Sequence, residues 1–485
     1  MKVTVLVGME VHLQLRTKSK MFSPAPVRFG APPNTLVDPV VLGLPGALPV
    51  PNREAITMAL SLATALGATP AEVTGFDRKN YFYPDLPKGY QISQYDRPLA
   101  TGGAVEVVTR DGVRTVRLRR LHIEEDTGKS LHDDRGGLSR VDFNRAGTPL
   151  VEIVSEPDIA SPEEARAYLN ALRAVVRYLD ISDANMQEGN LRCEPNVNLH
   201  IERGPSDVVE TPIVEIKNLN SVRNVERALR FEIERQLAEY EEKGPAVAHE
   251  PRSTRGYDDG RDVTFLMRRK EAEHDYRYFP EPDIPPLTIT DEWRAAAAAR
   301  VPELPDAKRR RFMAEHGLNA YDAFTLCRER STADYFERVV AADCAAKPAA
   351  NWVLTELSRH ANENKVPVAE LGLAPAHLAL LVGLVQGGRV ARRTAAQQVL
   401  PAMLETGAEP QAIVSELGLA QIDDEAVLRD AARQAVAAHP QAVADYRAGK
   451  KKAIGALMGF VMQATQGKAN SELVRSVVAE VLEES

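Results

Sequence analysis

Acidic side chains and one histidine stand in parts of this 485-residue chain that have the residue pattern of strands. Between residues 8 and 14 polar and apolar residues alternate, so Glu10, His12 and Gln14 share one face of the expected strand. The opposite face is apolar. Carboxylates and an imidazole on one face can ligate a divalent cation, although an isolated polar strand face is more often simply solvated.

Two later segments add carboxylates. Glu124, Glu125 and Asp126 follow an apolar-alternating stretch, and three adjacent carboxylates repel one another unless water or a cation screens them. Glu152 is a single glutamate in an otherwise apolar strand, and glutamate is rarely buried unless it is paired or bound to metal. If these carboxylates converge with His12, they suit Mg²⁺ or Mn²⁺. Spacing alone leaves both a metal site and solvated faces open.

Two further motifs bear on nucleotide binding. The Gly-Lys-Ser at 128–130 matches the end of a P-loop, but Ile123 stands where that loop needs its first glycine, so no P-loop is predicted. Residues 80–91 are dense in aromatic residues, proline and glycine, and they include Lys88. Such a loop suits a nucleotide or an RNA end, and equally well a packed surface loop.

The bulk composition limits the class of protein. The net charge of −8 argues against a surface that is basic throughout, as in a general nucleic-acid binder. No apolar run reaches the roughly 18 residues needed to span a bilayer, and the N-terminus does not resemble a signal peptide. The three cysteines are scattered, which favours a reducing compartment. We therefore expect a cytoplasmic protein with no membrane partner.

The elements that must position these residues fall into parts of different composition. Proline and aromatic residues concentrate before Trp293, whereas the later part is rich in alanine and predicted all-helical. Prolines in 281–286 mark a plausible boundary. The sequence predicts an α+β fold in three parts: a cradle domain with an antiparallel or mixed sheet and flanking helices over 1–292, an all-helical domain over 293–406, and a small all-helical tail over 407–485.

Local signals place strands and helices in the first part. Strands are expected at 2–7, 11–15, 105–108, 113–118 and 208–214. Asp111 and Gly112 predict a hairpin between the third and fourth of these strands. Ser161 and Ser221 take N-cap positions before two amphipathic helices.

The tail is expected to consist of short helices. They are predicted at 410–417, 424–438, 440–447, 450–465 and 471–483, with Asp423 and Asn470 as two of their N-caps. A lysine run at 450–452 opens one of them. Such runs are usually solvated helix faces, and phosphate contact is the alternative.

Long sequence words through most of the chain resemble the GatB family, the B subunits of the bacterial aspartyl/glutamyl-tRNA amidotransferases. These words are VGMEVHLQL at 7–15, GLPGALP at 43–49, DRKNYFYPDLPKGYQISQ at 77–94, LHIEEDTGKS at 121–130, NRAGTPLVEIVSEPD at 144–158, EIKNLNS at 215–221, DYRYFPEPD at 275–283 and PELP at 302–305. So many words in one order make the resemblance specific.

The resemblance implies an activity and partners. The A subunit, a glutaminase, would release ammonia from glutamine, and the small C subunit would complete the complex. The GatB chain would use ATP to phosphorylate the side-chain carboxylate of a misacylated Glu-tRNA or Asp-tRNA. Ammonia arriving through a tunnel would then displace the phosphate and leave Gln-tRNA or Asn-tRNA.

The resemblance also implies site residues. The family's Mg²⁺ site carries over to Glu10, His12, Glu125 and Glu152, with Glu124 as the alternative to Glu125. Glu125 and Lys88 are the catalytic candidates, Lys88 as a phosphate contact. In the tail, the candidates for contact with tRNA phosphates are Lys450, Lys451, Lys452 and Lys468.

The chain departs from the family at a zinc site. Many members carry four cysteines there, and the matching positions hold Ser23, Ala25, Asp38 and Val41. Without thiolates we expect no structural zinc. Two other functions stay open at this point: a tRNA-binding scaffold without catalysis, against which the intact acidic positions argue, and a free-standing metal-dependent hydrolase, which would leave the helical tail unexplained.

Overall fold

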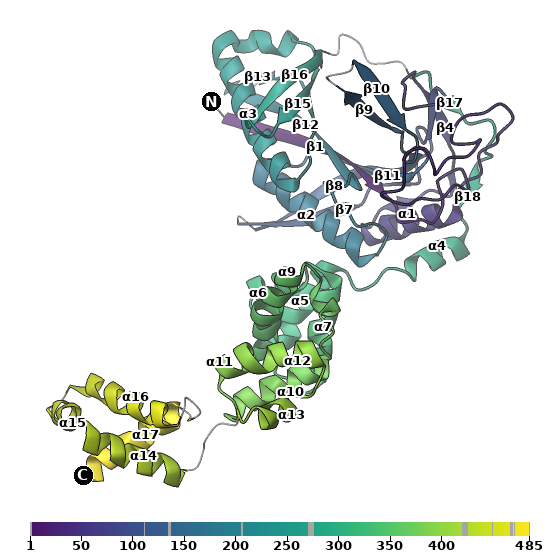
Figure 1. Cartoon of the computed structure of the whole chain (residues 1–485). Coiled ribbons are helices and arrows are strands. Elements are labelled where there is room, and N and C mark those ends of the chain that lie inside the picture. Colours follow the sequence, from purple (N-terminus) through teal and green to yellow (C-terminus); the bar gives the residue numbers. More distant parts are fainter. Residues whose placement is uncertain are drawn as a thin grey trace. The chain divides into compact units, whose positions relative to one another are not determined.

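A computed structural model describes residues 2–110, 112–133, 137–204, 207–269, 276–419, 425–448, 450–465, 469 and 471–484 of the chain. The chain divides into two compact units, Met1–Leu304 and Pro305–Ser485 (Figure 1). The first unit is built on a large sheet and the second is helical, which confirms the predicted α+β class. The predicted domain divisions after residues 292 and 406 stay predictions.

An eleven-stranded sheet forms the framework of the first unit within the described residues. Its main path runs in the order β16-β15-β14-β12-β1-β11-β8-β6-β2, while β13 pairs with β12 and β7 pairs with β8. Of these pairs only β14 with β15 is parallel, so the sheet is mixed. The strands are β1 (Lys2–Gln14), β2 (Thr69–Pro70), β6 (Ala100–Thr101), β7 (Ala104–Thr109), β8 (Gly112–Glu125), β11 (Pro149–Ser155), β12 (Leu191–Gly204), β13 (Asp207–Glu210), β14 (Val214–Lys217), β15 (Ser253–Asp258) and β16 (Val263–Arg269).

Strand β1 lies between β12 and β11 near the centre of the sheet. Four of its apolar residues are fully buried: Val7, Met9, Val11 and Leu13. They belong to one hydrophobic core with helices α1 (Arg53–Ala65) and α2 (Pro162–Tyr178). The alternate residues Glu10, His12 and Gln14 therefore take the other face, as the period-two pattern predicts.

Several local predictions are confirmed in the first unit. Ser161 caps α2 by accepting a hydrogen bond from the Glu164 amide at 3.1 Å. Ser221 caps α3 (Val222–Lys243) in the same way. Strands β7 and β8 form the predicted hairpin. Asp111 lies outside the described residues.

Two strand predictions are wrong in extent. The segments 2–7 and 11–15 form the single strand β1, because β12 pairs with it continuously from Lys2 to Leu13. The segment 208–214 is divided between β13 and β14. Pro212 lies between them and has no amide hydrogen to donate to a ladder.

Shorter strands and one more helix complete the first unit. Strands β4 (Asp77–Asn80), β5 (Tyr90–Ser93) and β17 (Phe279–Pro280) form a separate sheet, in which β5 contacts β8. Helix α4 (Asp291–Ala298) packs on α1, where Trp293 Nε1 donates to Thr57 Oγ1 at 2.9 Å. The remaining strands are β3 (Val73–Thr74), β9 (Lys129–Asp133), β10 (Leu138–Asp142) and β18 (Leu287–Thr288).

The second unit contains two hydrophobic cores within the described residues. The first lies among α5 (Pro305–His316), α6 (Ala320–Leu326), α7 (Arg330–Ala341), α8 (Ala346–Asn351), η2 (Trp352–Leu357), α9 (Ser358–Asn364), η3 (Val368–Glu370), α10 (Pro375–Gln386), α11 (Arg392–Thr394), η4 (Ala395–Val399), α12 (Leu400–Thr406) and α13 (Pro410–Glu416). The second lies among α14 (Glu425–Ala438), α15 (Pro440–Arg447), α16 (Ile454–Ala464) and α17 (Ser471–Glu484), drawn in yellow-green to yellow in Figure 1.

The predicted tail helices are confirmed in order and approximate extent. The helix expected from residue 450 begins with a 3₁₀ turn, Lys451–Ala453, before α16. The predicted N-caps Asp423 and Asn470 lie outside the described residues. None of the helices that the structure describes combines the length and apolar content needed to cross a membrane.

Candidate functional site

Three neighbouring strands bring acidic and histidine side chains to one place on the sheet. His12 of β1 lies opposite Glu152 of β11, and Glu152 lies opposite His122 of β8. Directly opposed residues of a ladder have neighbouring side chains on the same face. Glu124 comes two residues after His122 and shares that face. The register of three strands therefore fixes the site.

His12, Glu124 and Glu152 form what we call the carboxylate cluster. One nitrogen or oxygen atom from each lies within 4.8 Å of the others. His12 Nε2 is 3.5 Å from Glu124 Oε1 and 3.3 Å from Glu152 Oε2. Beside the cluster, His122 Nε2 lies 3.0 Å from Glu152 Oε2. Both glutamates are buried, so their charges need partners nearby.

The two histidines supply the balancing charge. Burial alone would lower the pKa of His122, but the neighbouring Glu152 and Glu124 raise that pKa to about 9. The pKa of His12 is raised for the same reason. Burial would raise the pKa of Glu152, but His122 and His12 hold it well below its usual value. The pKa of Glu124 is also lowered, against burial, chiefly by His122, whose Nε2 lies 3.8 Å from Glu124 Oε2. The site thus keeps charged groups largely away from water.

Glu10 borders the carboxylate cluster but has another partner. Its Oε1 accepts a hydrogen bond from Asn196 Nδ2 at 2.9 Å. Burial, followed by the negative charges of Glu152 and Glu194, raises the pKa of Glu10. Among the described residues, the group of ligand atoms within 4.8 Å of one another does not include it.

The adjacent residues Glu124 and Glu125 enter different networks, because successive strand side chains point to opposite faces. Glu125 forms an ion pair with Lys88 and accepts a hydrogen bond from the Ile92 amide at 3.1 Å. The structure therefore places Glu124 beside His12, and it places the two catalytic candidates Glu125 and Lys88 together. The roles assigned to them stay predictions.

Sequence reasoning missed two charged residues at the carboxylate cluster. His122 lies two residues from Glu124, and this spacing could have placed it on the same face. Lys79 of β4 had no such signal. Burial would lower the pKa of Lys79, but the negative charge of Glu124, helped by Glu152, raises it. Its position depends on long-range packing of the small sheet.

The lysine candidates in the tail are exposed where they are described. Lys450 Nζ lies 3.1 Å from Asp445 Oδ1, and Lys451 and Lys452 occupy the 3₁₀ turn before α16. Lys468 lies outside the described residues. The predicted contacts with tRNA stay predictions.

The four positions that match the family's zinc site lie in one compact loop. Ser23 Oγ donates to Asp38 Oδ2 at 2.6 Å, and Asp38 Oδ1 accepts from the Val41 amide at 2.9 Å. Ala25 and Val41 are buried together against Ala146. Hydrogen bonds and apolar contacts therefore connect the same positions that thiolates would occupy in other members.

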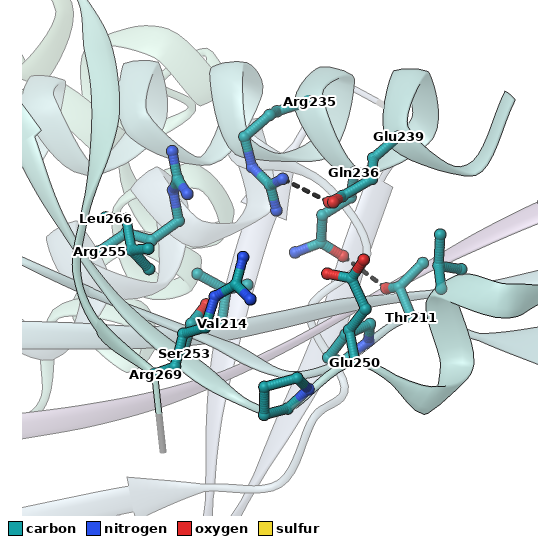
Figure 2. A pocket seen from close by; sticks show the side chains of 13 residues that line it. Thr211, Val214, Arg235, Gln236, Glu239, Glu250, Ser253, Arg255, Leu266 and Arg269 are labelled. Atoms are coloured by element: carbon teal, nitrogen blue, oxygen red, sulfur yellow. Dashed lines mark hydrogen bonds and ion pairs between the residues drawn. The ribbon is translucent and has the colours of Figure 1, made fainter. Parts of the chain in front are cut away.

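A separate pocket of about 60 Å³ lies between α3 and the strands β15 and β16 at one edge of the sheet (Figure 2). Arg235, Arg255 and Arg269 face it, together with Glu239 and Glu250. Some of these charged side chains form ion pairs. Arg235 Nη1, for example, lies 2.6 Å from Glu239 Oε2. Strands β14 and β12 separate this edge from β1, so the pocket is not part of the carboxylate cluster.

The fold and the site together define a class: a sheet-based enzyme domain with a charged, buried cluster, followed by helical bundles. Comparison with known families makes this specific. A family model described as the GatB/GatE catalytic domain matches residues 5–295, and one described as the GatB domain matches residues 334–482. The chain belongs to the GatB family, which confirms the resemblance seen in its sequence.

Relatives along the whole length are named as the B subunit of aspartyl/glutamyl-tRNA(Asn/Gln) amidotransferase. The protein from Thermotoga maritima is 46% identical over 489 residues, which cover 100% of both chains. The protein from Brevibacillus brevis is 44% identical over 481 residues, 99% of both chains. The protein from Thermomicrobium roseum is 47% identical over 488 residues, 100% of this chain and 99% of the relative.

Proposed function

We propose that the carboxylate cluster is where a misacylated tRNA has its side-chain carboxylate activated by ATP and then amidated. As a member of its family that matches its relatives along their length, the chain is the B subunit of a tRNA-dependent amidotransferase. It is a glutamine-dependent carbon–nitrogen ligase that acts within a complex. The proposed substrates are Glu-tRNA(Gln) and Asp-tRNA(Asn), which become Gln-tRNA(Gln) and Asn-tRNA(Asn).

The reaction needs activation because oxide is a poor leaving group. The carboxylate oxygen of the aminoacyl side chain takes the γ-phosphoryl group of ATP, which gives an acyl phosphate and ADP. Ammonia then attacks the carbonyl carbon, the bond to the phosphate oxygen breaks, and a proton leaves the nitrogen. Phosphoryl transfer gains most from positioning and from positive charge near the transferring oxygens.

The observation that carries the proposal is the cross-strand row of His12, Glu152 and His122, with Glu124 beside it. Buried charges brought together by strand register are costly for a fold that gains nothing else from them. Their position in the matched catalytic domain, residues 5–295, supports a catalytic use.

Mg²⁺ is the proposed ion, and the donor set fits it. Two carboxylates and one imidazole with ligand atoms within 4.8 Å of one another suit a hard divalent cation. His12, Glu124 and Glu152 would hold it, and His12 would first give up the proton described above, because only the neutral imidazole ligates a metal ion. The family resemblance adds Glu10 and Glu125. When bound, such an ion offsets negative charge on phosphoryl oxygens.

Other charged groups of the chain are proposed to position the substrates. The Lys79 ammonium interacts electrostatically with both glutamates of the carboxylate cluster and can attract an anionic substrate group. Lys88 is the proposed phosphate contact, and its ion pair with Glu125 orients the loop that carries it. Neither role needs a P-loop.

The proposed partners follow from the chemistry. The glutaminase, or A, subunit would supply ammonia, and the small C subunit would join the complex. The tail would contact tRNA through Lys450, Lys451 and Lys452, together with Lys468. Because aminoacylated tRNA is the substrate, we propose that the chain acts in the cytoplasm.

One assay tests this function. The chain is combined with the A and C subunits, glutamine, ATP, Mg²⁺ and Glu-tRNA(Gln), and Gln-tRNA is measured. We expect Gln-tRNA with this chain and none without it. A chain that binds tRNA but forms no amide would be a scaffold, and metal-dependent hydrolysis without amide formation would indicate a hydrolase. Either result would contradict the proposal.

A further inference from the structure

An open hollow of about 530 Å³ lies on the second unit, within its first helical bundle. The residues that line it are Glu356, Arg359, Arg392, Arg393, Ala396 and Gln397. Three of them are arginines, and we call this site the arginine hollow. Nothing in the carboxylate cluster or in the tail accounts for it.

Two π-helical segments meet at the arginine hollow. Segment η2 provides Glu356, and Arg359 follows in α9. Segment η4 provides Ala396 and Gln397, and Arg392 and Arg393 precede it in α11. Well under 1% of residues in globular proteins are π-helical, and such segments are frequent at functional sites. Within the described chain, the two π-helical segments both line this hollow.

The charges of the arginine hollow are not balanced by its lining. Glu356 is the only carboxylate among the described residues that line it. It lies 3.5 Å from Arg359 Nη2 and 3.9 Å from Arg392 Nη2, whereas Arg393 Nε donates to Gln397 Oε1 at 3.2 Å. One carboxylate cannot neutralise three guanidinium groups. An excess positive charge of about two units therefore faces solvent.

Two of the arginines are half-exposed, and one of them also contacts a buried aromatic ring. The Arg359 and Arg392 side chains are 49% and 52% exposed. The Arg392 guanidinium lies 5.6 Å from the ring centroid of Trp352, which is itself buried in the bundle. This cation–π contact restricts the conformations of the Arg392 side chain, while its hydrogen-bond donors stay accessible.

We propose that the arginine hollow binds backbone phosphates of the tRNA substrate. Arginine presents a planar fork of donors that matches phosphate oxygens, and an open hollow admits a chain that passes across it. A protein partner would need large apolar or aromatic anchors, and the lining residues offer none that is exposed. The inference rests on the proposed function in one respect, namely that the bound RNA is the tRNA substrate.

The test compares three variants of the full-length chain in complex with the A and C subunits. In the first, Arg359, Arg392 and Arg393 are replaced by Gln; in the second, the same residues are replaced by Lys. The matched control replaces three exposed arginines elsewhere in the same unit by Gln: Arg328, Arg330 and Arg338. For each, Kd for tRNA is measured from about 50 to 300 mM salt, and amide formation is measured at saturating tRNA.

We expect the Gln variant to bind tRNA about 10- to 100-fold more weakly, with the slope of log K against log salt reduced by about 2 to 3. The Lys variant keeps the charge and should keep the slope. The control should match the unaltered chain. Amide formation at saturating tRNA should persist in all three, because the hollow binds and does not react.

An unchanged Kd and slope in the Gln variant would overturn the inference. So would a Gln variant that no longer assembles into the complex but binds tRNA normally as a single chain, because the hollow would then serve an acidic protein partner. An equal loss of slope in the Lys variant would also count against phosphate contact. Failure of the unaltered complex to form amide would refute the proposed function and leave this binding result readable on its own.

Discussion

The carboxylate cluster and the arginine hollow hold charge in opposite ways. In the carboxylate cluster, buried glutamates are balanced by histidines at 3.0 to 3.5 Å, and the pKa of each of these groups is shifted. In the arginine hollow, half-exposed guanidinium groups outnumber their one carboxylate. A buried charge is stable only while all its partners are present. Exposed charges contribute to binding roughly independently of one another, and salt screens them.

This difference predicts how each region fails. Loss of one group from the carboxylate cluster leaves another buried charge unpaired. The effect on activity should therefore be large and independent of salt. Loss of one exposed cation should cost a fraction of the binding energy and should depend on salt. Four experiments test this contrast, from the largest expected effect to the smallest.

Glu152→Gln should have the largest effect. Both His12 and His122 contact Glu152, so the neutral amide removes the shared partner of two cations. We expect kcat for amide formation to fall about 10³-fold, with little change in Kd for tRNA. Single-turnover amidation measures the first and filter binding the second. Glu202→Gln, at the far end of the same sheet, is the control. A comparable loss of kcat in the control would contradict a catalytic role of the carboxylate cluster.

Glu124→Gln and Glu125→Gln separate two adjacent glutamates. Glu124 lies beside His12, whereas Glu125 pairs with Lys88. Glu124→Gln should therefore raise the Mg²⁺ concentration for half-maximal activity more than about tenfold. Glu125→Gln should lower kcat while that Mg²⁺ concentration changes less than about twofold. A Mg²⁺ titration of both variants decides the assignment, and the reverse pattern would restore Glu125 as the ligand.

Lys20→Met tests a buried charge outside the carboxylate cluster. Lys20 is fully buried, and burial lowers its pKa to about 8, although Asp38 and Glu125 act in the opposite direction. The unfolded chain holds this proton up to pH 10.5. Charged Lys20 therefore costs stability below pH 8, and the cost fades as pH rises from about 8 to 10.5.

We expect Lys20→Met to raise the free energy of unfolding by about 2 kcal/mol at pH 7. The gain should shrink toward zero by about pH 10.5. Urea unfolding of the variant and the unaltered chain across this range measures it. Lys2→Met, a change at an exposed lysine, should show no such trend. A gain that stays constant with pH would mean that methionine improves packing and that Lys20 carries no charge penalty.

Replacing Lys450, Lys451 and Lys452 by Gln should give the smallest effect. Because Lys450 already pairs with Asp445, about two free charges are lost. We expect binding to weaken about tenfold, with the salt slope reduced by about 2. Binding titrations at several salt concentrations measure both, with Lys347→Gln and Lys365→Gln combined as the matched control. An unchanged slope would remove these lysines from the tRNA interface.

Sequence patterns predicted what local geometry controls. Alternation placed Glu10 and His12 on one strand face, and Ser161 and Ser221 marked two helix starts. Alternation could not choose between Glu124 and Glu125, because the choice depends on how β8 aligns with β11 about 25 residues later in the chain. The position of a strand partner is a long-range property.

The arginine hollow lay beyond sequence reasoning for a similar reason. Arg359 and the pair at 392–393 are separated by more than 30 residues, and each is an ordinary exposed arginine in its own helix. Only the tertiary arrangement of η2, α11 and η4 brings them together. The π-helical turns were not predicted either, because they are defined by backbone hydrogen bonds between residues i and i+5, which only the structure shows.

The central position of β1 has a consequence for synthesis. It leaves the ribosome well before its two partners, because β11 begins at Pro149 and β12 begins at Leu191. At a synthesis rate of roughly 5 to 20 residues per second, on the order of ten seconds pass between the synthesis of β1 and that of β11. Of the two helices that share its core, α1 precedes β11 in the chain but α2 follows it, so part of the apolar face of β1 lacks its final cover during that time. The centre of the sheet therefore forms late in synthesis, and the nascent chain exposes apolar strand surface until β11 and β12 have been made.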